Sequence, residues 1–375
     1  MESIVPLVAE HYPSLPALRI ADWRGPASTL LPELLLCRNL RSFTTEESPS
    51  VKFAPFHIRT LLDSLPRLAA LKVHVEDCGE KQRNATPIYA PNLRTLCCIG
   101  TCADLAGVAA MLRASALHEL ELWITDESTM TPSDLVECVQ NATSAHLSSA
   151  LRKLSITSGL PRKFRRVPLG RTRASWASGL RPSPTLQQLE HFELSVSPNL
   201  FVPSVTDADA LAIAQAMPRL RSLSIRNRHF NNVGLPSLHA LLHFAKFCPD
   251  LEHLSLEGLG GTPIPDLGAV RLAAPSARGH PLRSLRLVTV NSAVDAPDVL
   301  AELLDYLFPH LTFQPPRRGT ALRLSSETWD DTARLLVLLQ RKRREAAAVP
   351  GSPDLETWGE ETAGTCRTLD PGIHL

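Results

Sequence analysis

The chain has 375 residues, of which 44% are hydrophobic and 62 are leucine, so it can bury a large core and wholesale disorder is excluded. Its 39 Lys and Arg against 38 Asp and Glu leave a net charge of +1, which gives no reason to expect bulk nucleic-acid binding or an acidic-membrane partner. The sequence has no apolar run of membrane-spanning length and no secretory signal, and its eight cysteines are irregularly spread. We therefore expect a cytoplasmic protein, with a nuclear location as the alternative.

A short apolar phrase, Leu-x-x-Leu-x-Leu, recurs along most of the chain. Its copies, some of them loose, start at Leu15, Leu40, Leu68, Leu93, Leu117, Leu151, Leu189, Leu220, Leu251 and Leu282. The last three intervals are each 31 residues, and self-similarity at such a period indicates stacked repeats. Within one copy, apolar residues two positions apart lie on the same face of a strand. Each copy therefore predicts one short buried strand.

The residues between copies return the chain to the start of the next strand, and several of these returns carry helical signals. Thr131-Pro132-Ser133-Asp134 supplies an N-cap, a proline at the first helical position and an acid at the third. Residues 206–217 have a similar cap and stop at Pro218, and residues 236–247 carry an apolar stripe at helical spacing. Strand, turn and helix in repetition predict an α/β solenoid, a right-handed horseshoe of about ten irregular repeats, over residues 1–296.

The sequence changes character after the last copy, and we expect residues 297–345 to form a helical cap. The pattern predicts one helix over residues 297–311 and, after a Pro/Arg/Gly loop, a second over residues 328–345. The second helix ends in the basic run 341–344, which favours the helix dipole; a nuclear-localisation cluster is the alternative reading. Pro, Gly, Ser, Thr and Glu dominate residues 346–375, where we expect a disordered tail.

These phrases closely resemble a leucine-rich repeat. The junctions at Leu65-Pro66-Arg67-Leu68, Met217-Pro218-Arg219-Leu220 and Cys248-Pro249-Asp250-Leu251 resemble those of repeats found with F-box domains. The closing order of helix, Phe308-Pro309-His310-Leu311-Thr312, loop, Trp329-Asp330 and leucine helix is similar to that of F-box-like leucine-rich-repeat proteins, which mushroom-forming fungi encode in large numbers. The resemblance covers about residues 10–345.

The resemblance also implies an F-box, for which the sequence leaves no room. Such a domain is a helical segment with a Leu-Pro-x-Glu signature that precedes the repeats, whereas the first phrase here starts at Leu15. Residues 31–35, Leu-Pro-Glu-Leu-Leu, mimic the signature, but Leu40 follows with a strand phrase where an F-box would continue as helix. We therefore expect either that the chain lost the F-box or that the sequence starts downstream of it, and a genuine F-box fragment at residues 31–35 is the alternative.

The function that the resemblance implies is non-catalytic protein–protein recognition, as in the substrate-binding part of an F-box ubiquitin-ligase receptor. The partners would be a target protein on the repeat surface and, only if an F-box is present, the cullin-ligase adaptor. The alternative is a stand-alone interaction scaffold unrelated to ubiquitin. GTPase-activating or nuclease-inhibiting repeat proteins fit less well, because their units are regular and the intervals here range from 24 to 38 residues. No membrane, nucleic-acid or cofactor partner is expected.

The outward positions of the predicted strands form the candidate partner-binding surface. In a horseshoe they face the concave side, where an exposed Trp amid charges is the composition of a binding hot spot. The alternative is a solvated sheet face without a ligand. The candidate residues are Glu119, Glu121, Trp123, Lys153, His191, Glu193, Arg226, His253, Glu257 and Arg286.

A basic loop within the longest interval is a second candidate. Loops on one face of a solenoid often carry partner contacts, and this one could attract phosphate or acidic peptides; a solvated loop is the alternative. Its residues are Arg162, Lys163, Arg165, Arg166, Arg171 and Arg173.

Neither catalysis nor metal binding is expected. Cys97, Cys98 and Cys102 form the one thiol cluster, and no Cys-x-x-Cys pair or nearby His completes a zinc site. The sequence contains no Ser/His/Asp elbow, and the glycines near residue 260 lack the lysine and helix of a phosphate-binding loop.

Overall fold

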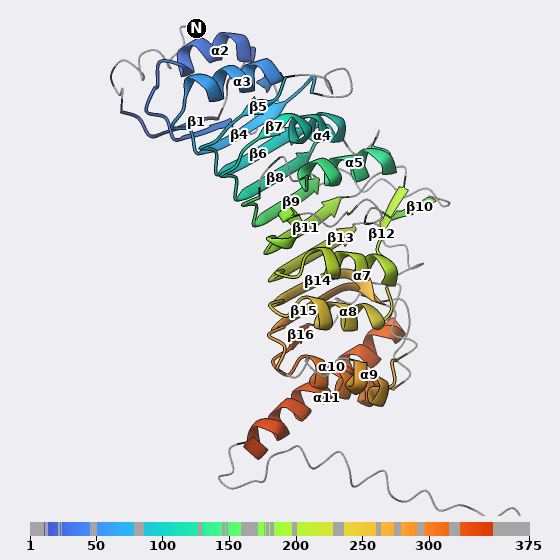
Figure 1. Ribbon diagram of the computed structural model, residues 1–375. Helices are drawn as coiled ribbons and strands as arrows, with labels where there is room; N and C mark the ends of the chain where they lie inside the picture. The colour runs from blue at the N-terminus through green and yellow to red at the C-terminus, as the bar shows by residue number, and fades with distance from the viewer. Residues whose placement is uncertain are drawn as a thin grey trace, which may run out of the picture.

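The computed structural model shows a mixed α/β protein in which a long parallel sheet is lined by helices on one face (Figure 1). It describes residues 11 and 14–347, apart from residues 22, 24, 46–50, 79–85, 127–129, 145–146, 148, 159–171, 176, 178–179, 181–183, 197–200, 228–235, 260–263, 274–278, 291–295 and 315–322. Among the described residues, no helix combines the length and the apolarity needed to cross a membrane.

Every copy of the apolar phrase forms a strand, and the strands pair in parallel in the order of the chain. One additional strand, β3 (Lys52–Phe53), pairs with the second half of β4. The eleven strands of the main path are β1 (Ala17–Ile20), β2 (Ser42–Thr45), β4 (Ala70–Val75), β6 (Thr95–Gly100), β8 (Glu119–Ile124), β9 (Lys153–Ser158), β11 (His191–Val196), β13 (Ser222–Asn227), β14 (His253–Leu259), β15 (Ser284–Val290) and β16 (Thr312–Gln314).

Helices follow most of these strands and form the second layer (Figure 1). They are α2 (Ala27–Leu34), α3 (Pro55–Ser64), α4 (Cys102–Met111), α5 (Pro132–Ala142), α6 (Pro184–Gln187), α7 (Asp207–Ala216), α8 (His239–Phe247), α9 (Leu267–Ala273), α10 (Pro297–Leu307) and α11 (Arg323–Ala347). Two short parallel pairs lie outside the main sheet: β5 (Ile88–Tyr89) with β7 (Leu112–Arg113), and β10 (Thr172–Ser175) with β12 (Phe201–Ser204).

Capping boxes start the helices where the sequence predicted. The amide of Asp134 donates to Thr131 Oγ1, and the Asp134 carboxylate accepts the Thr131 amide at 2.8 Å, so α5 begins at Pro132. Thr206 and Asp209 form the same reciprocal pair before α7, which ends before Pro218 as predicted. These caps satisfy amides that a helix start leaves without partners.

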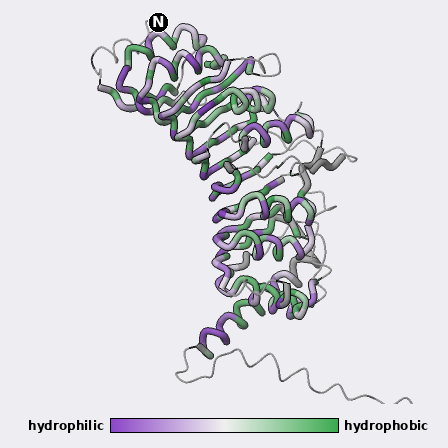
Figure 2. The backbone as a smooth tube through the Cα atoms, viewed as in Figure 1, coloured by the Kyte–Doolittle hydropathy of each residue, from purple (hydrophilic) through white to green (hydrophobic). Residues whose placement is uncertain are grey.

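The core is a continuous layer between the sheet and the helices. Leu120, Leu122, Leu154 and Ile156, the inward residues of β8 and β9, are at most 1% exposed. Each such side chain contributes about 1.5–3 kcal/mol on burial, which no single repeat could gain alone. Figure 2 shows hydrophobic positions recurring along the whole array in alternation with hydrophilic ones, so the core extends through all repeats.

Residues 31–35, which mimic an F-box signature, belong mostly to the helix of a repeat. Leu31 and Leu34 lie in α2 and are buried in the core, and β2 begins at Ser42. The strand expected after Leu40 is therefore present, and the apolar side chains of residues 31–35 that face the core pack inside the repeat.

The segment 297–345 contains the two expected helices with a strand of the main sheet between them. Helix α10 ends at Leu307 rather than at residue 311, because Phe308-Pro309-His310-Leu311 is another repeat junction that leads into β16. Helix α11 starts at Arg323, before the predicted residue 328, and ends at Ala347. Residues 348–375, nearly all of the expected tail, lie outside the described residues.

The basic end of α11 is anchored on α10. Arg343 donates to Asp305 Oδ2 at 2.8 Å and to the Pro309 carbonyl oxygen, and Gln340 Nε2 donates to the Leu311 carbonyl oxygen at 2.9 Å. Arg341 instead pairs with Glu345 one turn along the helix. Arg343 of the basic run 341–344 therefore helps to hold the last helix in place.

Candidate functional site

The outward side chains of the sheet form rows, because parallel pairing puts equivalent residues of successive repeats side by side. In the first row, Glu119 pairs with Lys153, which pairs with His191. The second row aligns Glu121, Ser155 and Glu193 in the same way. The rows continue through Ser222 and Ser224 of β13 to His253 and Ser255 of β14.

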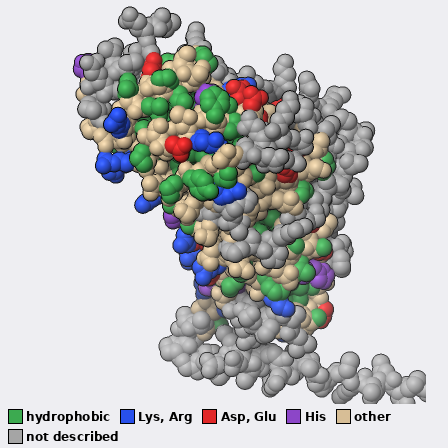
Figure 3. Space-filling model, turned by 45° about the horizontal axis from the view of Figure 1, so that its top comes forward, with side chains coloured by type: hydrophobic (Ala, Val, Ile, Leu, Met, Phe, Trp, Pro, Cys, Tyr) green, Lys and Arg blue, Asp and Glu red, His purple; other side chains and the backbone are tan. Residues whose placement is uncertain are grey.

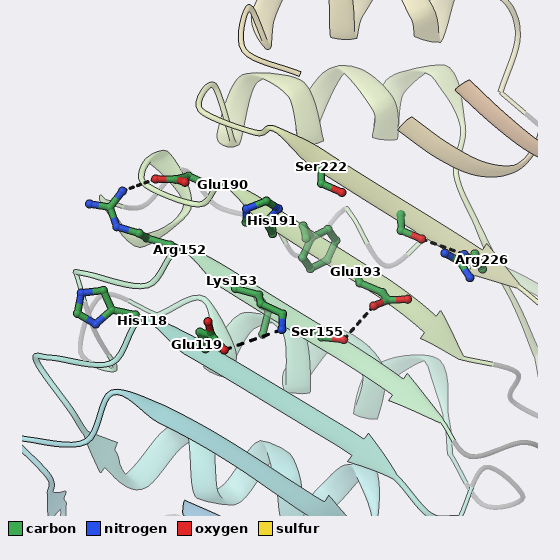
Figure 4. Close-up of a pocket in the computed structure, with 13 residues that line it drawn as sticks. His118, Glu119, Arg152, Lys153, Ser155, Glu190, His191, Glu193, Ser222 and Arg226 are labelled. Carbon is green, nitrogen blue, oxygen red and sulfur yellow. Dashed lines mark hydrogen bonds and ion pairs between the residues drawn. The ribbon is translucent and has the colours of Figure 1, made fainter. Parts of the chain in front are cut away.

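A cavity of about 690 Å³ lies on this face over β8, β9, β11 and β13 (Figure 4). Its hollow arises where the short side chains of Ser155, Ser222 and Ser224 stand between longer charged ones. Five predicted residues line it: Glu119, Lys153, His191, Glu193 and Arg226. The other lining residues are His118, Arg152, Leu154, Ser155, Glu190, Phe192, Ser222 and Ser224.

Hydrogen bonds fix the charged side chains around the cavity. Lys153 Nζ lies 2.8 Å from Glu121 Oε1 and 3.9 Å from Glu119 Oε2. The hydrogen bond that Lys153 donates to Glu121, with the nearby carboxylates, raises the pKa of Lys153, so this ammonium group stays charged. Glu193 accepts from Ser155 Oγ at 3.3 Å (Figure 4).

Within the described part of the chain, the Arg226 guanidinium group keeps bonding capacity for a ligand. Its Nε donates to Ser224 Oγ at 3.0 Å, which uses one of the five guanidinium N–H groups. Glu193 likewise uses one of its carboxylate oxygens in the bond to Ser155. The cavity thus presents a cation and an anion on neighbouring strands, each already oriented by a serine.

Three ionisable lining residues were missed by the sequence analysis: His118, Arg152 and Glu190. They occupy the first x position of Leu-x-x-Leu, just before each strand, whereas the prediction took only the positions within the strand. Arg152 forms an ion pair with Glu190, and Arg221 Nε lies 4.0 Å from the same carboxylate. The signal was present in the sequence as a charged residue recurring after the first leucine.

The remaining predicted face residues lie beside the cavity or beyond it. Glu121 contacts Lys153, and Trp123, 42% exposed, has Lys72 Nζ at 5.2 Å from its ring centroid. His253 on β14 and Arg286 on β15 are exposed farther along the sheet. Glu257 lies in β14, but its side chain is not among those described.

The basic loop falls almost wholly outside the described residues. Arg162, Lys163, Arg165, Arg166 and Arg171 belong to the segment 159–171. Arg173 lies in β10, with a side chain that is not described. The prediction for this loop therefore stays a prediction.

The thiols of the cysteine cluster are buried and protonated. Burial raises the pKa of Cys97 to about 11 although it lies on the outward row, and adjacent Cys98 is in the core. A hydrogen bond to Cys138 on α5, together with burial, raises the pKa of Cys102. A protonated thiol is a poor nucleophile and metal ligand. In the described part of the chain, no group of three His, Cys, Asp or Glu residues is placed to hold a metal ion.

The chain matches no family model and no curated protein. Among solved structures, it is similar to a protein from Bacteroides fragilis, with 12% identity, coverage of 83% of this chain and 68% of that chain, and a TM-score of 0.36. It is also similar to a chain in the crystal structure of the Rad7 and Elc1 complex in yeast, with 13% identity, coverage of 83% and 86%, and a TM-score of 0.31. At these scores neither likeness bears on the function of the chain.

Proposed function

We propose that this protein is a leucine-rich-repeat solenoid that binds a protein partner on the outward face of its sheet. The observation that carries the proposal is the cavity over β8 to β13, where charged side chains are already oriented around a serine floor. Orientation in advance lowers the entropy lost when a partner binds. A catalytic role is not part of the proposal, because the cavity offers ion pairs and hydroxyl groups without an activated nucleophile.

The partner would be recognised through side chains. Parallel pairing on both sides uses the backbone hydrogen bonds of β9 and β11, so a partner cannot add a strand there. Arg226 and Glu193 suit an acidic and a basic group of the partner, respectively. Trp123 lies on the same face and supplies the large aromatic surface typical of a hot spot.

The resemblance to F-box-associated repeats extends the proposal to a ubiquitin-ligase substrate receptor. The cavity face would then hold the target for ubiquitination. Residues 31–35 support no adaptor contact of their own, because Leu31 and Leu34 are packed into the core. Purified chain mixed with the cullin-ligase adaptor tests this part: robust binding supports the receptor role, and failure to bind leaves the stand-alone scaffold.

Filling the cavity tests the binding face itself. The double variant Ser222→Arg with Ser224→Arg places two large cations on the floor, and Gln215→Arg, on the exposed side of α7, adds a cation to the helical layer as a control. Tagged versions of the protein and both variants are compared for captured proteins by quantitative mass spectrometry. We expect a set of partners that is retained by the control and lost by the double variant. Partners that bind all three equally would refute the assignment of the site, provided that circular dichroism shows both variants folded.

A further inference from the structure

The edge at which the strands begin carries a regular row of side chains outside the cavity floor. We call it the edge row: Arg41, Ala69, Arg94, His118, Arg152, Glu190, Arg221, Glu252 and Arg283. The carbonyl oxygen of each residue accepts from one or two amides of the next repeat; Arg94, for example, accepts from His118 at 2.8 Å and Glu119 at 3.1 Å. Successive members of the edge row are therefore separated by one strand spacing, about 4.8 Å.

The second half of the edge row neutralises itself. From Arg152 to Arg283 the charges alternate in sign, and Glu190 lies between Arg152 and Arg221, within ion-pair distance of both. Arginines of this half have acidic neighbours within the row, so little net charge remains for a ligand.

The first half has the opposite character. From Arg41 to His118 the edge row contains no acid, and Arg67 of the neighbouring junction adds a further guanidinium group. Arg67 is held in place by Asn39 Oδ1 at 2.6 Å. Arg41, Arg67 and Arg94 are all exposed, and none of them has a carboxylate partner within the described residues. Figure 3 shows Lys and Arg side chains following one another down one side of the molecule.

We propose that Arg41, Arg67 and Arg94, the basic edge, bind an extended acidic peptide segment of a protein partner. The two outer arginines are two strands, or about 10 Å, apart, and side chains on one side of an extended peptide repeat about every 7 Å. The long, flexible arginine side chains can compensate for the difference between these two spacings. The planar guanidinium group can form two parallel hydrogen bonds to one carboxylate. The basic edge is separate from the cavity, so this inference does not depend on the proposed function.

Acidic peptide is favoured over nucleic acid by the surroundings of the basic edge. The first half of the edge row has no Phe, Tyr or Trp on which a base could stack.

Fluorescence anisotropy with labelled probes tests the proposal. The probes are an octapeptide of glutamate, an octapeptide of glutamine and a thymidine octanucleotide. The test variant is Arg41→Gln, Arg67→Gln and Arg94→Gln in the full chain. The control variant, Arg221→Gln and Arg283→Gln in the self-neutralised half together with Arg219→Gln in the adjoining junction, removes the same charge; Arg219 matches Arg67 in position and donates to Gln188 Oε1 at 2.6 Å. Circular dichroism verifies that each is folded.

The expected result is salt-sensitive binding of the glutamate peptide and no binding of the glutamine peptide. We expect the affinity for the glutamate peptide to fall about fivefold or more in the test variant and to stay within about twofold in the control. Equal losses of affinity for the glutamate peptide in both variants would mean that only net charge matters, which would overturn the proposal. An unchanged affinity in the test variant would also overturn it, because the acidic peptide would then bind elsewhere, for example on the loop 161–173. Tighter binding of the oligonucleotide than of the glutamate peptide would also overturn the proposal.

Discussion

Gly107 in α4 is the position at which the packing of the helix layer against a strand turn can be tested most sharply. A Cβ built there would lie 1.6 Å from the Cys78 carbonyl oxygen and 2.5 Å from its carbonyl carbon. The turn cannot simply retreat, because the Cys78 amide donates to Asp104 Oδ1 at 2.8 Å, and Asp104 is itself held by Thr101, the N-cap of α4, whose Oγ1 donates to Asp104 Oδ2 at 2.7 Å. Asp77, at φ 55°, makes the sharp bend that brings this carbonyl to the helix.

The expected effect of Gly107→Ala follows from two opposing contributions. In an ordinary helix interior, alanine stabilises relative to glycine by about 0.8–1 kcal/mol. Overpacking against a fixed neighbour costs about 1–3 kcal/mol, and the contact with backbone places this site at the upper end. We therefore expect the free energy of unfolding to fall by about 1–2 kcal/mol.

Urea unfolding followed by circular dichroism measures this change, and hydrogen exchange at the amides of α4 locates it. The matched control is Gly268→Ala in α9, where the added Cβ would lie 3.2 Å from Asp266 Oδ2, a side-chain atom that needs to shift by only a few tenths of an ångström. That variant is expected to be as stable as the original protein or more so. A Gly107→Ala protein that unfolds at the same urea concentration as Gly268→Ala would refute the close contact.

Two further predictions concern buried titratable groups. His280 Nε2 donates to the Cys248 carbonyl oxygen at 2.9 Å, Nδ1 accepts the Leu282 amide at 3.2 Å, and burial lowers the pKa of the imidazole. The neutral imidazole therefore stabilises the fold above the unfolded pKa of about 6.5, and this stabilisation is lost as the pH falls below that value. Urea unfolding should show that the free energy of unfolding falls less between pH 7.5 and pH 5.5 in His280→Phe than in the original protein. Arg343→Met leaves Asp305, whose pKa burial already raises, without its cation and should cost about 1–3 kcal/mol. That cost should be smaller at pH 5 than at pH 7.5, and an equal cost at both pH values would contradict an ionised Asp305.

The sequence predicted the strands well because each of them buries its own apolar pair. All ten phrases became strands, and the capping boxes at Thr131 and Thr206 became helix starts, since both signals are local. The eleventh strand was missed because Phe308-Pro309-His310-Leu311, which leads into it, was taken as the end of the preceding helix. The junction at Pro309, similar to that at Pro218, carried the missing information.

The start of α8 and the cavity could not be predicted from the sequence, because both depend on contacts between different repeats. Helix α8 starts at His239, not at Pro236, because Ser237 is held by Asp207, 30 residues earlier, and accepts the His239 amide. The cavity depends on which side chains become neighbours across strands: Ser155 and Ser224 flank Glu193 only through the register of β9, β11 and β13. Neither relation is visible within a single repeat.

The strands are paired through main-chain hydrogen bonds along the edge row, so the fold and the outward side chains are largely independent of each other. Because main-chain groups there bond to the next repeat, as Arg152 does to Glu190 and His191, the backbone pairing of the strands does not depend on which side chains occupy the outward rows. Such a surface can change its residues with little penalty to folding. Divergent copies of this chain would then keep their leucines and vary at the outward positions, and a new target would be acquired by exchanging side chains on an unaltered backbone.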